Sequence, residues 1–394
     1  MNWFTVIFAT LIEGLSAFGR SSAISPFLGA LCQDLSLSKV HISSAYSLGY
    51  LAAGLVLPFL GRIYDRIPLR YFLQGLIGLF GFIWLSLGWG LSALATHPFW
   101  CWIGLMLGFI GIRICIQAYG VVRSALIASG WNHCRGLVTA CSALIIALMG
   151  STCPYLCYQA SQWVTWQSAC LLFGGLWLLF LIPAQWAATP MTLSVPPNGF
   201  QASWIGGPKV IVFYCVLFIL GFKHFQESGI AFHLVSMCKE FGVDARLVSA
   251  SFISITVLSI GVSFIAPPLF RHLGARFILL VFLLSDLGML YGLHCISKQG
   301  MLTLFIVCSG IYWGIHAILT PLVIPSLFNE KKLGALQGAA YAAMSLGSAL
   351  GPFYFAWMEE LYSYQMGLKL CLLIAFLMPL MGLFIKPTSS SPEV

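Results

Sequence analysis

Charged side chains are scarce in this chain. Asp, Glu, Lys and Arg together make up 8% of its 394 residues, whereas a soluble globular protein carries roughly 25%. Hydrophobic residues make up 60%. A surface with so few charges cannot be hydrated on all sides, which excludes an ordinary soluble domain. We therefore expect a membrane protein whose outer surface faces lipid.

Patterns that carry metal binding, nucleotide binding or catalysis are also missing. The 13 cysteines are scattered without a CxxC pair, and the closest spacing is Cys153 to Cys157. Since a free cysteine behaves as a small hydrophobe, we expect neither a disulfide framework nor a metal site. No phosphate-binding loop is present, so the sequence does not imply ATP as the energy source. Without a catalytic constellation, we expect neither an enzyme nor a cofactor.

Two further features narrow the class of protein. The N-terminus lacks the basic region and the small-residue cleavage site of a signal peptide, so the first apolar segment is expected to be retained. The formal net charge is +8, but no basic patch is interleaved with aromatic residues, and a nucleic-acid partner is not expected. Most Lys and Arg lie at the ends of apolar segments, as is typical of membrane topology.

Apolar segments of membrane-spanning length are abundant. About 20 apolar residues in a helix cross the hydrocarbon core of a bilayer, which is about 30 Å thick. Twelve segments qualify, at approximately 3–31, 39–60, 70–92, 98–128, 132–160, 165–187, 209–238, 245–269, 275–296, 300–328, 333–358 and 364–386. A stretch rich in Pro, Gly and Ser follows the sixth. We predict an all-α membrane protein with 12 transmembrane helices in two pseudo-symmetric six-helix lobes: 1–188, a cytoplasmic linker at 189–208, and 209–394 with a short tail.

The two halves share sequence features. A basic loop at 61–70 follows the second segment, and a basic loop at 269–276 occupies the corresponding position in the second half. Gly136, at the start of the fifth segment, has a counterpart in Gly334, at the start of the eleventh, about 198 residues later. A duplicated half with arginines between apolar spans indicates the internal repeat of a two-lobed membrane transporter.

Loop charges predict the orientation in the membrane. One set of loops is strongly positive, whereas carboxylates dilute the positive charges of the other set. The positive set comprises Arg62, Arg66, Arg70, Arg135, Lys209, Arg271, Arg276, Lys331 and Lys332. This set is expected to be cytoplasmic. Twelve spans then leave both termini in the cytoplasm, with the chain in the cell (inner) membrane.

A family resemblance rests on the motifs around these loops. Twelve spans in two halves, with Gly61…Asp65-Arg66…Arg70 between the second and third, resemble the major facilitator superfamily. Within it, the chain is similar to the monocarboxylate and oxalate–formate porter branch over 37–70, at Trp…Arg-Gly-Leu in 131–137 and at Phe…Leu-Gly…Gly in 328–338.

The resemblance implies a secondary transporter with a cytoplasmic gate. In such a gate Asp65 interacts with Arg123, and Arg66 and Arg70 complete the latch. The chain departs from the branch in spans eight and eleven, where the better-known anion sites of that branch place an Arg or a Lys. Here 247–269 and 333–357 contain no charged residue.

Glu13 and Arg20 of the first span are candidate functional residues. A charge at the bilayer centre costs roughly 2.5–3.5 kcal/mol, so it usually faces a cavity or a partner. The two residues are seven apart, about 10 Å along one helix face, and can line one cavity. Loss of hydration favours the neutral form of the Glu13 carboxyl, which makes Glu13 a candidate proton carrier. A salt bridge to another helix is an equal alternative.

The fourth span contains Arg113 near its middle and Gln117 one turn later. A guanidinium can hold a carboxylate through two hydrogen bonds, and the resemblance implies the same pattern of Arg followed by Gln. We predict that Arg20, Arg113 and Gln117 bind substrate, with a structural ion pair as the alternative for Arg113. Arg123 lies about 15 Å further along the helix, toward the predicted gate.

The C-terminal half contributes a second group of titratable residues. Span seven contains Lys223, His224, Glu227 and His233, span nine contains Asp286, and span ten contains His316. Lys223 and Glu227 are four residues apart and can pair on one face. His224, His233 and Glu227 are candidate proton carriers, and Lys223 and His316 are candidate substrate ligands. Packing is the alternative for each histidine, and Asp286 is predicted to be structural.

These residues together favour a transporter of small organic anions. The mid-membrane positive groups Arg20, Arg113 and Lys223 outnumber what a neutral ligand needs. We predict alternating access of the two lobes to a carboxylate, driven by protons or by exchange with a counter-anion. One alternative is an exporter of amphipathic compounds, and a remote one is a non-transporting membrane sensor.

Overall fold

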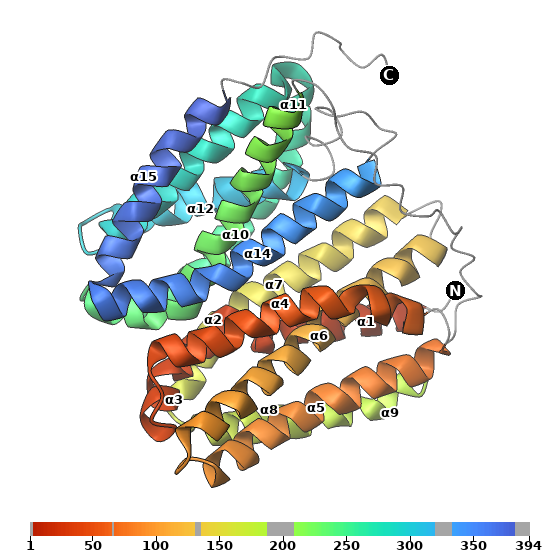
Figure 1. Cartoon of the computed structure of the whole chain (residues 1–394). Helices are drawn as coiled ribbons and strands as arrows, with labels where there is room; N and C mark the ends of the chain where they lie inside the picture. Colours follow the sequence, from red (N-terminus) through yellow and green to blue (C-terminus); the bar gives the residue numbers. More distant parts are fainter. Residues whose placement is uncertain (1–2, 65–66, 131–134, 187–208, 320–332, 383–394) are drawn as a thin grey trace. The chain divides into compact units, whose positions relative to one another are not determined.

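The computed structural model describes residues 3–64, 67–130, 135–186, 209–319 and 333–382. Within these ranges the regular structure is entirely helical (Figure 1). Each of the twelve predicted spans is predominantly helical over the part of it that is described, so the predicted fold class is confirmed.

The first predicted span is a chain of short helices rather than one rod. Its pieces are α1 (Trp3–Leu15), the 3₁₀ turn η1 (Ser16–Gly19), α2 (Ser21–Ile24), the 3₁₀ turn η2 (Ser25–Phe27) and α3 (Leu28–Asp34). Arg20 is extended, with φ −83° and ψ 166°, and it separates η1 from α2. Pro26 inside η2 has no amide proton for an α-helical hydrogen bond. The break places the Arg20 side chain between two helical pieces, inside the span.

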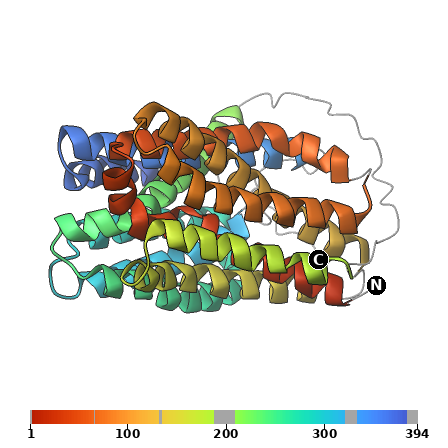
Figure 2. The same ribbon diagram turned by 90° about the horizontal axis from the view of Figure 1, so that it is seen from below.

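The remaining helices of the first half are longer. They are α4 (Lys39–Tyr64), α5 (Leu69–Ala93), α6 (Pro98–Gly130), α7 (Arg135–Ser161), α8 (Trp166–Leu179) and α9 (Leu181–Ala184). Helices α5 and α8 run side by side (Figure 1 and Figure 2). Between them and α6, Trp177 Nε1 donates to Tyr119 Oη at 3.2 Å, and that hydroxyl donates to the Leu76 carbonyl at 3.1 Å. The buried polar atoms of Trp177 and Tyr119 in this aromatic core are thus hydrogen-bonded.

The second half contains α10 (Lys209–Glu240), α11 (Ala245–His294), α12 (Met301–Ile318), α14 (Leu333–Leu361) and α15 (Tyr364–Gly382). Helix α11 covers two predicted spans, 245–269 and 275–296. Its backbone leaves the helical conformation at Gly274, with φ 78° and ψ 173°. A positive φ is a region that L side chains rarely adopt, so this glycine separates two spans within α11.

Six of the described helices are individually long and apolar enough to cross a membrane. These stretches are Leu69–Ala93, Pro98–Ile127, Leu137–Ser161, Trp166–Ala184, Ile211–Glu240 and Ala245–His294. The broken first span explains why its pieces fall below this length when each is taken singly.

The chain forms two compact units. One comprises Met1–Pro197 with Ser228–Ser236, and the other comprises Asn198–Glu227 with Met237–Val394. The predicted linker at 189–208 lies outside the described residues, so the lobe limits at 188 and 209 stay a prediction.

Helices α10 and α14 approach each other closely at glycines. A Cβ added to Gly347 would overlap the carbonyl oxygen of Gly221, so the backbones touch with no room for a side chain. Small residues allow such close packing between membrane helices. Gly261 of α11, by contrast, has no atom within 4 Å of its Cβ position.

We predict that Gly347→Ala destabilises the protein by about 1–3 kcal/mol, because the new methyl group forces the two helices apart. Gly261→Ala is the matched control, and it should be neutral or stabilising by up to about 1 kcal/mol through helix propensity. Thermal unfolding in detergent compares the two variants with the parent. Equal melting temperatures for both variants would contradict the close approach of α10 and α14.

Candidate functional site

Arg113 is a buried cation packed against two aromatic rings. It lies on α6 with 4% of its surface exposed. Its guanidinium carbon is 3.8 Å from the ring centre of Tyr50 and 4.6 Å from that of Tyr46, both on α4. Such cation–π contacts offset part of the cost of dehydrating the charge. Nε and Nη2 have no hydrogen-bond partner in the described part of the chain, so two donors remain available.

The local sequence explains why the two tyrosines reach Arg113. Tyr46 and Tyr50 are four residues apart and share one face of α4. Gly49 lies between them, and its Cβ position is 2.9 Å from the backbone of Phe109 on α6. The absent side chain at residue 49 lets α4 and α6 approach. The aromatic bracket was missed in the sequence because tyrosine is common in this chain, although a Tyr pair at four-residue spacing was visible there.

Gln117 and Arg20 lie in the same part of the first unit. Gln117 is one turn from Arg113, and its buried Oε1 has no described hydrogen-bond partner. Arg20 is close enough to Arg113 for their charges to interact. It also reaches α7, where its Nη1 is 3.5 Å from the Cβ position of Gly150. No carboxylate among the described residues lies within 4.0 Å of either guanidinium. The arrangement can therefore accept an anion.

Glu13 has a different partner from these two arginines. Its Oε2 is 2.5 Å from Nε of Arg123 on α6, and Arg123 Nη1 donates to Ser142 Oγ on α7 at 3.0 Å. The structure therefore has the salt bridge that was the alternative for Glu13. The ion pair ties α1, α6 and α7 together. Both side chains are largely buried, so each charge compensates the other.

The predicted cytoplasmic gate can be followed only in part. Asp65 and Arg66 lie outside the described residues, so the predicted contact of Arg123 with Asp65 stays a prediction. Arg70 is described, and its Nη2 donates to the hydroxyl of Tyr71 at 2.5 Å.

The second unit contains a group of titratable side chains on α10, α11 and α12, which we call the C-lobe cluster. Its members are Lys223, His224, Glu227, Asp286 and His316. Lys223 Nζ is 3.3 Å from Glu227 Oε2, so the predicted pairing on one helix face is present. Lys223 also lies 4.3 Å from the ring centre of Trp313.

The two histidines of the C-lobe cluster pack against each other. Their ring centres are 5.4 Å apart in an edge-to-face arrangement, and Nδ1 of His224 is 3.7 Å from Glu227. Among the described residues, no group of His, Cys, Asp or Glu could hold a metal ion. The cluster brings titratable side chains from three helices together in the second unit.

Asp286 belongs to this cluster, which the sequence did not predict. It lies on α11 with 2% of its surface exposed, and Gln226 Nε2 donates to its Oδ2 at 3.4 Å. Lys223 is close enough for the two charges to interact. The signal that was available is a single carboxylate in an otherwise apolar span, which needs a partner inside the protein.

His233 is apart from the C-lobe cluster. It is fully buried within Ser228–Ser236, the part of α10 that belongs to the first unit. Its Nε2 is 3.3 Å from Ser43 Oγ on α4. The hydrogen-bonded packing role that was the alternative for this residue is consistent with that contact.

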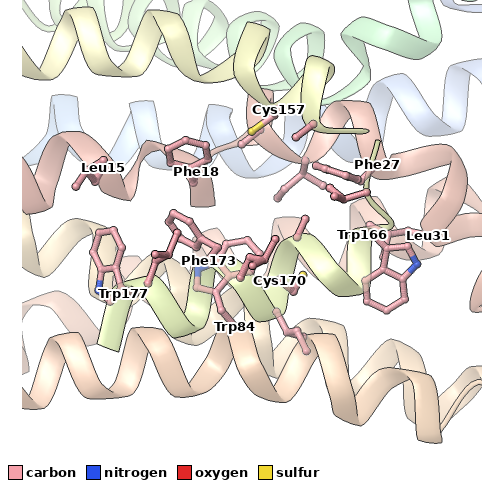
Figure 3. Close-up of a pocket in the computed structure, with 18 of the residues that line it drawn as sticks. Leu15, Phe18, Phe27, Leu31, Trp84, Cys157, Trp166, Cys170, Phe173 and Trp177 are labelled. Carbon is pink, nitrogen blue, oxygen red and sulfur yellow. The ribbon is translucent and has the colours of Figure 1, made fainter. Parts of the chain in front are cut away.

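An apolar cavity of about 590 Å³ lies in the first unit (Figure 3). Phe18 of the first span and Phe173 of α8 meet there, with ring centres 5.0 Å apart, and Trp84 of α5 lies 5.2 Å from Phe173. The lining consists of aliphatic, aromatic and cysteine side chains. None of the predicted substrate or proton ligands lines it, so it is separate from the arrangement around Arg113.

We predict that the Glu13–Arg123 pair stabilises the fold as a unit. Glu13→Gln or Arg123→Gln alone should cost up to about 3 kcal/mol, because each leaves a buried charge without its partner. The double variant should be more stable than the sum of the single effects implies. Thermal unfolding of the three variants in detergent measures the coupling. Strictly additive losses would contradict the ion pair.

Comparisons with known proteins agree with this architecture. The sequence matches the Major Facilitator Superfamily over residues 6–352. No curated protein matches the chain in sequence. Among solved structures, the chain is similar to a bacterial homologue of the human lysosomal transporter Spinster in an inward-facing, unoccupied conformation. That similarity has a TM-score of 0.72 and 11% identity, covering 98% of this chain and 97% of that one.

Two other solved structures are also similar. The nucleoside transporter NupG has a TM-score of 0.68 and 12% identity, covering 98% of this chain and 100% of that one. The human organic anion transporter MFSD10 (TETRAN) has a TM-score of 0.57 and 14% identity, covering 97% and 98%. At these identities the structures show a shared fold. The family match and the fold together show that this chain belongs to the Major Facilitator Superfamily and is a multi-pass membrane secondary transporter rather than an enzyme.

Proposed function

We propose that this transporter moves a small organic anion, with a carboxylate as the substrate class, and that Arg113 binds the anionic group. The observation that carries the proposal is a guanidinium with 4% exposure, two donors without a described partner, and no described carboxylate within 4.0 Å. An uncompensated charge is costly inside a membrane protein. A substrate that supplies the opposite charge removes that cost.

The neighbours of Arg113 suit the same ligand. Tyr46 and Tyr50 pack against the guanidinium, and a guanidinium can hold a carboxylate through two hydrogen bonds. Arg20 adds a second positive charge, and Gln117 adds a hydrogen-bonding amide. We assign Arg20, Arg113 and Gln117 to substrate binding. Lys223 and His316 are secondary candidates, because Lys223 already has Glu227 as a partner.

The family branch and the energy source are part of the proposal. The motifs at 37–70 and 131–137 support the monocarboxylate and oxalate–formate porter branch, and MFSD10 is described as an organic anion transporter. Proton coupling or anion exchange supplies the drive. Glu13, Glu227, His224 and His233 are the candidate proton carriers, and Glu13 is paired with Arg123 in the structure.

The proposal also retains the predicted topology. The lobes are 1–188 and 209–394, joined by a cytoplasmic linker at 189–208, and both termini face the cytoplasm of a cell (inner) membrane. Excess positive charge in one set of loops supports this orientation. Asp65, Arg66, Arg70 and Arg123 are proposed to form the cytoplasmic gate, on the strength of the family resemblance.

One observation favours a second candidate function, export of amphipathic compounds. The cavity of about 590 Å³ in the first unit is lined by apolar and aromatic groups and could hold a lipophilic molecule. A lipophilic substrate does not need Arg113. The two candidates therefore differ in what happens when the charge of Arg113 is removed.

We predict that Arg113→Gln abolishes carboxylate uptake. Losing one member of a buried charged contact costs about 2–5 kcal/mol, so uptake at low substrate concentration should fall at least about 30-fold. Arg113→Lys should restore part of it, because the charge returns without the planar fork. The assay is uptake of labelled mono- and dicarboxylates into proteoliposomes that contain the full chain.

The matched control for this experiment is Arg276→Gln. Arg276 is an exposed arginine on α11, so its loss should leave uptake unchanged. Carboxylate uptake by Arg113→Gln at the same rate as the unmodified protein would contradict the proposal. If the folded wild-type protein takes up no acid but transports an amphipathic cation or neutral compound, the exporter is favoured instead.

A further inference from the structure

The C-lobe cluster contains more carboxylates than it has strong bases to neutralise them. Lys223 is its one lysine or arginine among the described residues, whereas Glu227 and Asp286 both contribute a carboxyl group. With all three ionised and both histidines neutral, the cluster carries one net negative charge. An excess charge in an apolar interior is unfavourable. The cluster reaches neutrality when one carboxyl holds a proton.

The geometry distinguishes the two carboxyl groups. Glu227 lies 3.3 Å from Lys223 Nζ, and 30% of its side chain is exposed. Asp286 is almost completely buried, and its hydrogen-bonding neighbours are two neutral groups, the amide of Gln226 at 3.4 Å and the hydroxyl of Tyr312. Its Oδ1 has no hydrogen-bond partner in the described part of the chain. This geometry favours an ion pair between Lys223 and an ionised Glu227. It favours Asp286 as the carboxyl group that holds the extra proton.

Three helices contribute groups that interact with Asp286. Helix α10 contributes Lys223 and Gln226, helix α12 contributes the hydroxyl of Tyr312, and helix α15 contributes the thiol of Cys371. Lys223 is the one full positive charge among them. When the proton leaves, Asp286 becomes a second anion that competes with Glu227 for the same ammonium group.

We propose that Asp286 is the proton-binding residue that couples transport to a proton gradient, with Lys223 as the switch between two carboxylates. The proposal rests on the proposed function of an anion transporter and deepens it. In the protonated state Lys223 pairs with Glu227. Release of the proton from Asp286 creates a new ion-pair partner for Lys223 and so favours a different arrangement of α10 and α11. Glu227 and His224, the partly exposed members of the cluster, give the proton its route to water.

The first test does not depend on the substrate. Asparagine has the shape of a protonated aspartic acid and carries no charge. If Asp286 is protonated in the folded protein, Asp286→Asn should leave the melting temperature in detergent at neutral pH unchanged. Glu227→Gln should lower it, because Lys223 loses its ionised partner. The opposite order, with Asp286→Asn the more damaging change, would overturn the proposal.

The second test separates coupling from transport. Proteoliposomes with the full chain are loaded with a carboxylate, and two activities are measured with the same labelled acid: accumulation driven by a pH gradient, and exchange without a gradient. Asp286→Asn should lose the gradient-driven accumulation and keep the exchange. Asp286→Glu should keep both and shift the pH dependence of uptake. Ser285→Ala should behave as wild type, because Ser285 is a neighbouring buried position whose hydroxyl donates to the Val281 carbonyl of the same helix at 2.7 Å.

The remaining outcomes are also decisive. Gradient-driven accumulation by Asp286→Asn, or an unchanged pH dependence in Asp286→Glu, overturns the assignment of Asp286. Loss of both activities in a folded Asp286→Asn protein indicates a structural role and overturns it as well. If the wild-type protein exchanges the acid but a pH gradient drives no accumulation, the proposed proton coupling is overturned. The proposed anion transport then still holds. Absence of any acid transport by the wild type contradicts the proposed function, and the melting temperatures then still decide whether Asp286 is protonated.

Discussion

The constraint on which this structure depends is that an ionised side chain in an apolar interior needs a compensating partner. Glu13 and Arg123 satisfy it with an ion pair at 2.5 Å, and Lys223 and Glu227 do so at 3.3 Å. Arg113 and Asp286 do not satisfy it with a described ion pair. An uncompensated charge costs several kcal/mol. We therefore propose that a bound anion compensates the charge of Arg113 and that a bound proton neutralises Asp286. The proposed transport of an acid together with a proton follows from these two needs.

The backbone serves the same constraint. The extended backbone at Arg20 divides the first span into short helices. At this break the guanidinium of Arg20 lies near Arg113. Gly49 brings α4 against α6, so that the two tyrosines can bracket Arg113, and the contact of Gly221 with Gly347 joins α10 to α14. The glycines and the broken helix set the distances at which the charged side chains meet.

Much of the fold could be predicted from the sequence, because hydrophobic length is a local property. The helices of the described residues were found in this way. The Lys223–Glu227 pair was predictable for the same reason, since four-residue spacing on a helix fixes the contact. The break around Arg20 was not predicted: its serines and glycine do not stop a helix individually, and only Pro26 lacks an amide proton.

Contacts between distant helices could not be derived from spacing. Glu13 and Arg123 are 110 residues apart, and their pairing depends on how α1 packs on α6. The same holds for Asp286, which looked isolated on its own span because its partners lie on α10, α12 and α15. The tyrosines beside Arg113 were hidden among many aromatic residues whose roles in packing and in binding look alike in a sequence.

The most direct test of the central claim is calorimetric titration of the purified transporter with a series of carboxylic acids and the amides of the same acids. Acid and amide have nearly the same size and shape, so the comparison isolates the negative charge that Arg113 is proposed to need. The account predicts heat of binding for at least one acid, no detectable binding of its amide, and no binding of either by Arg113→Gln. Equal affinity for acid and amide, or acid binding that survives in Arg113→Gln, would contradict it.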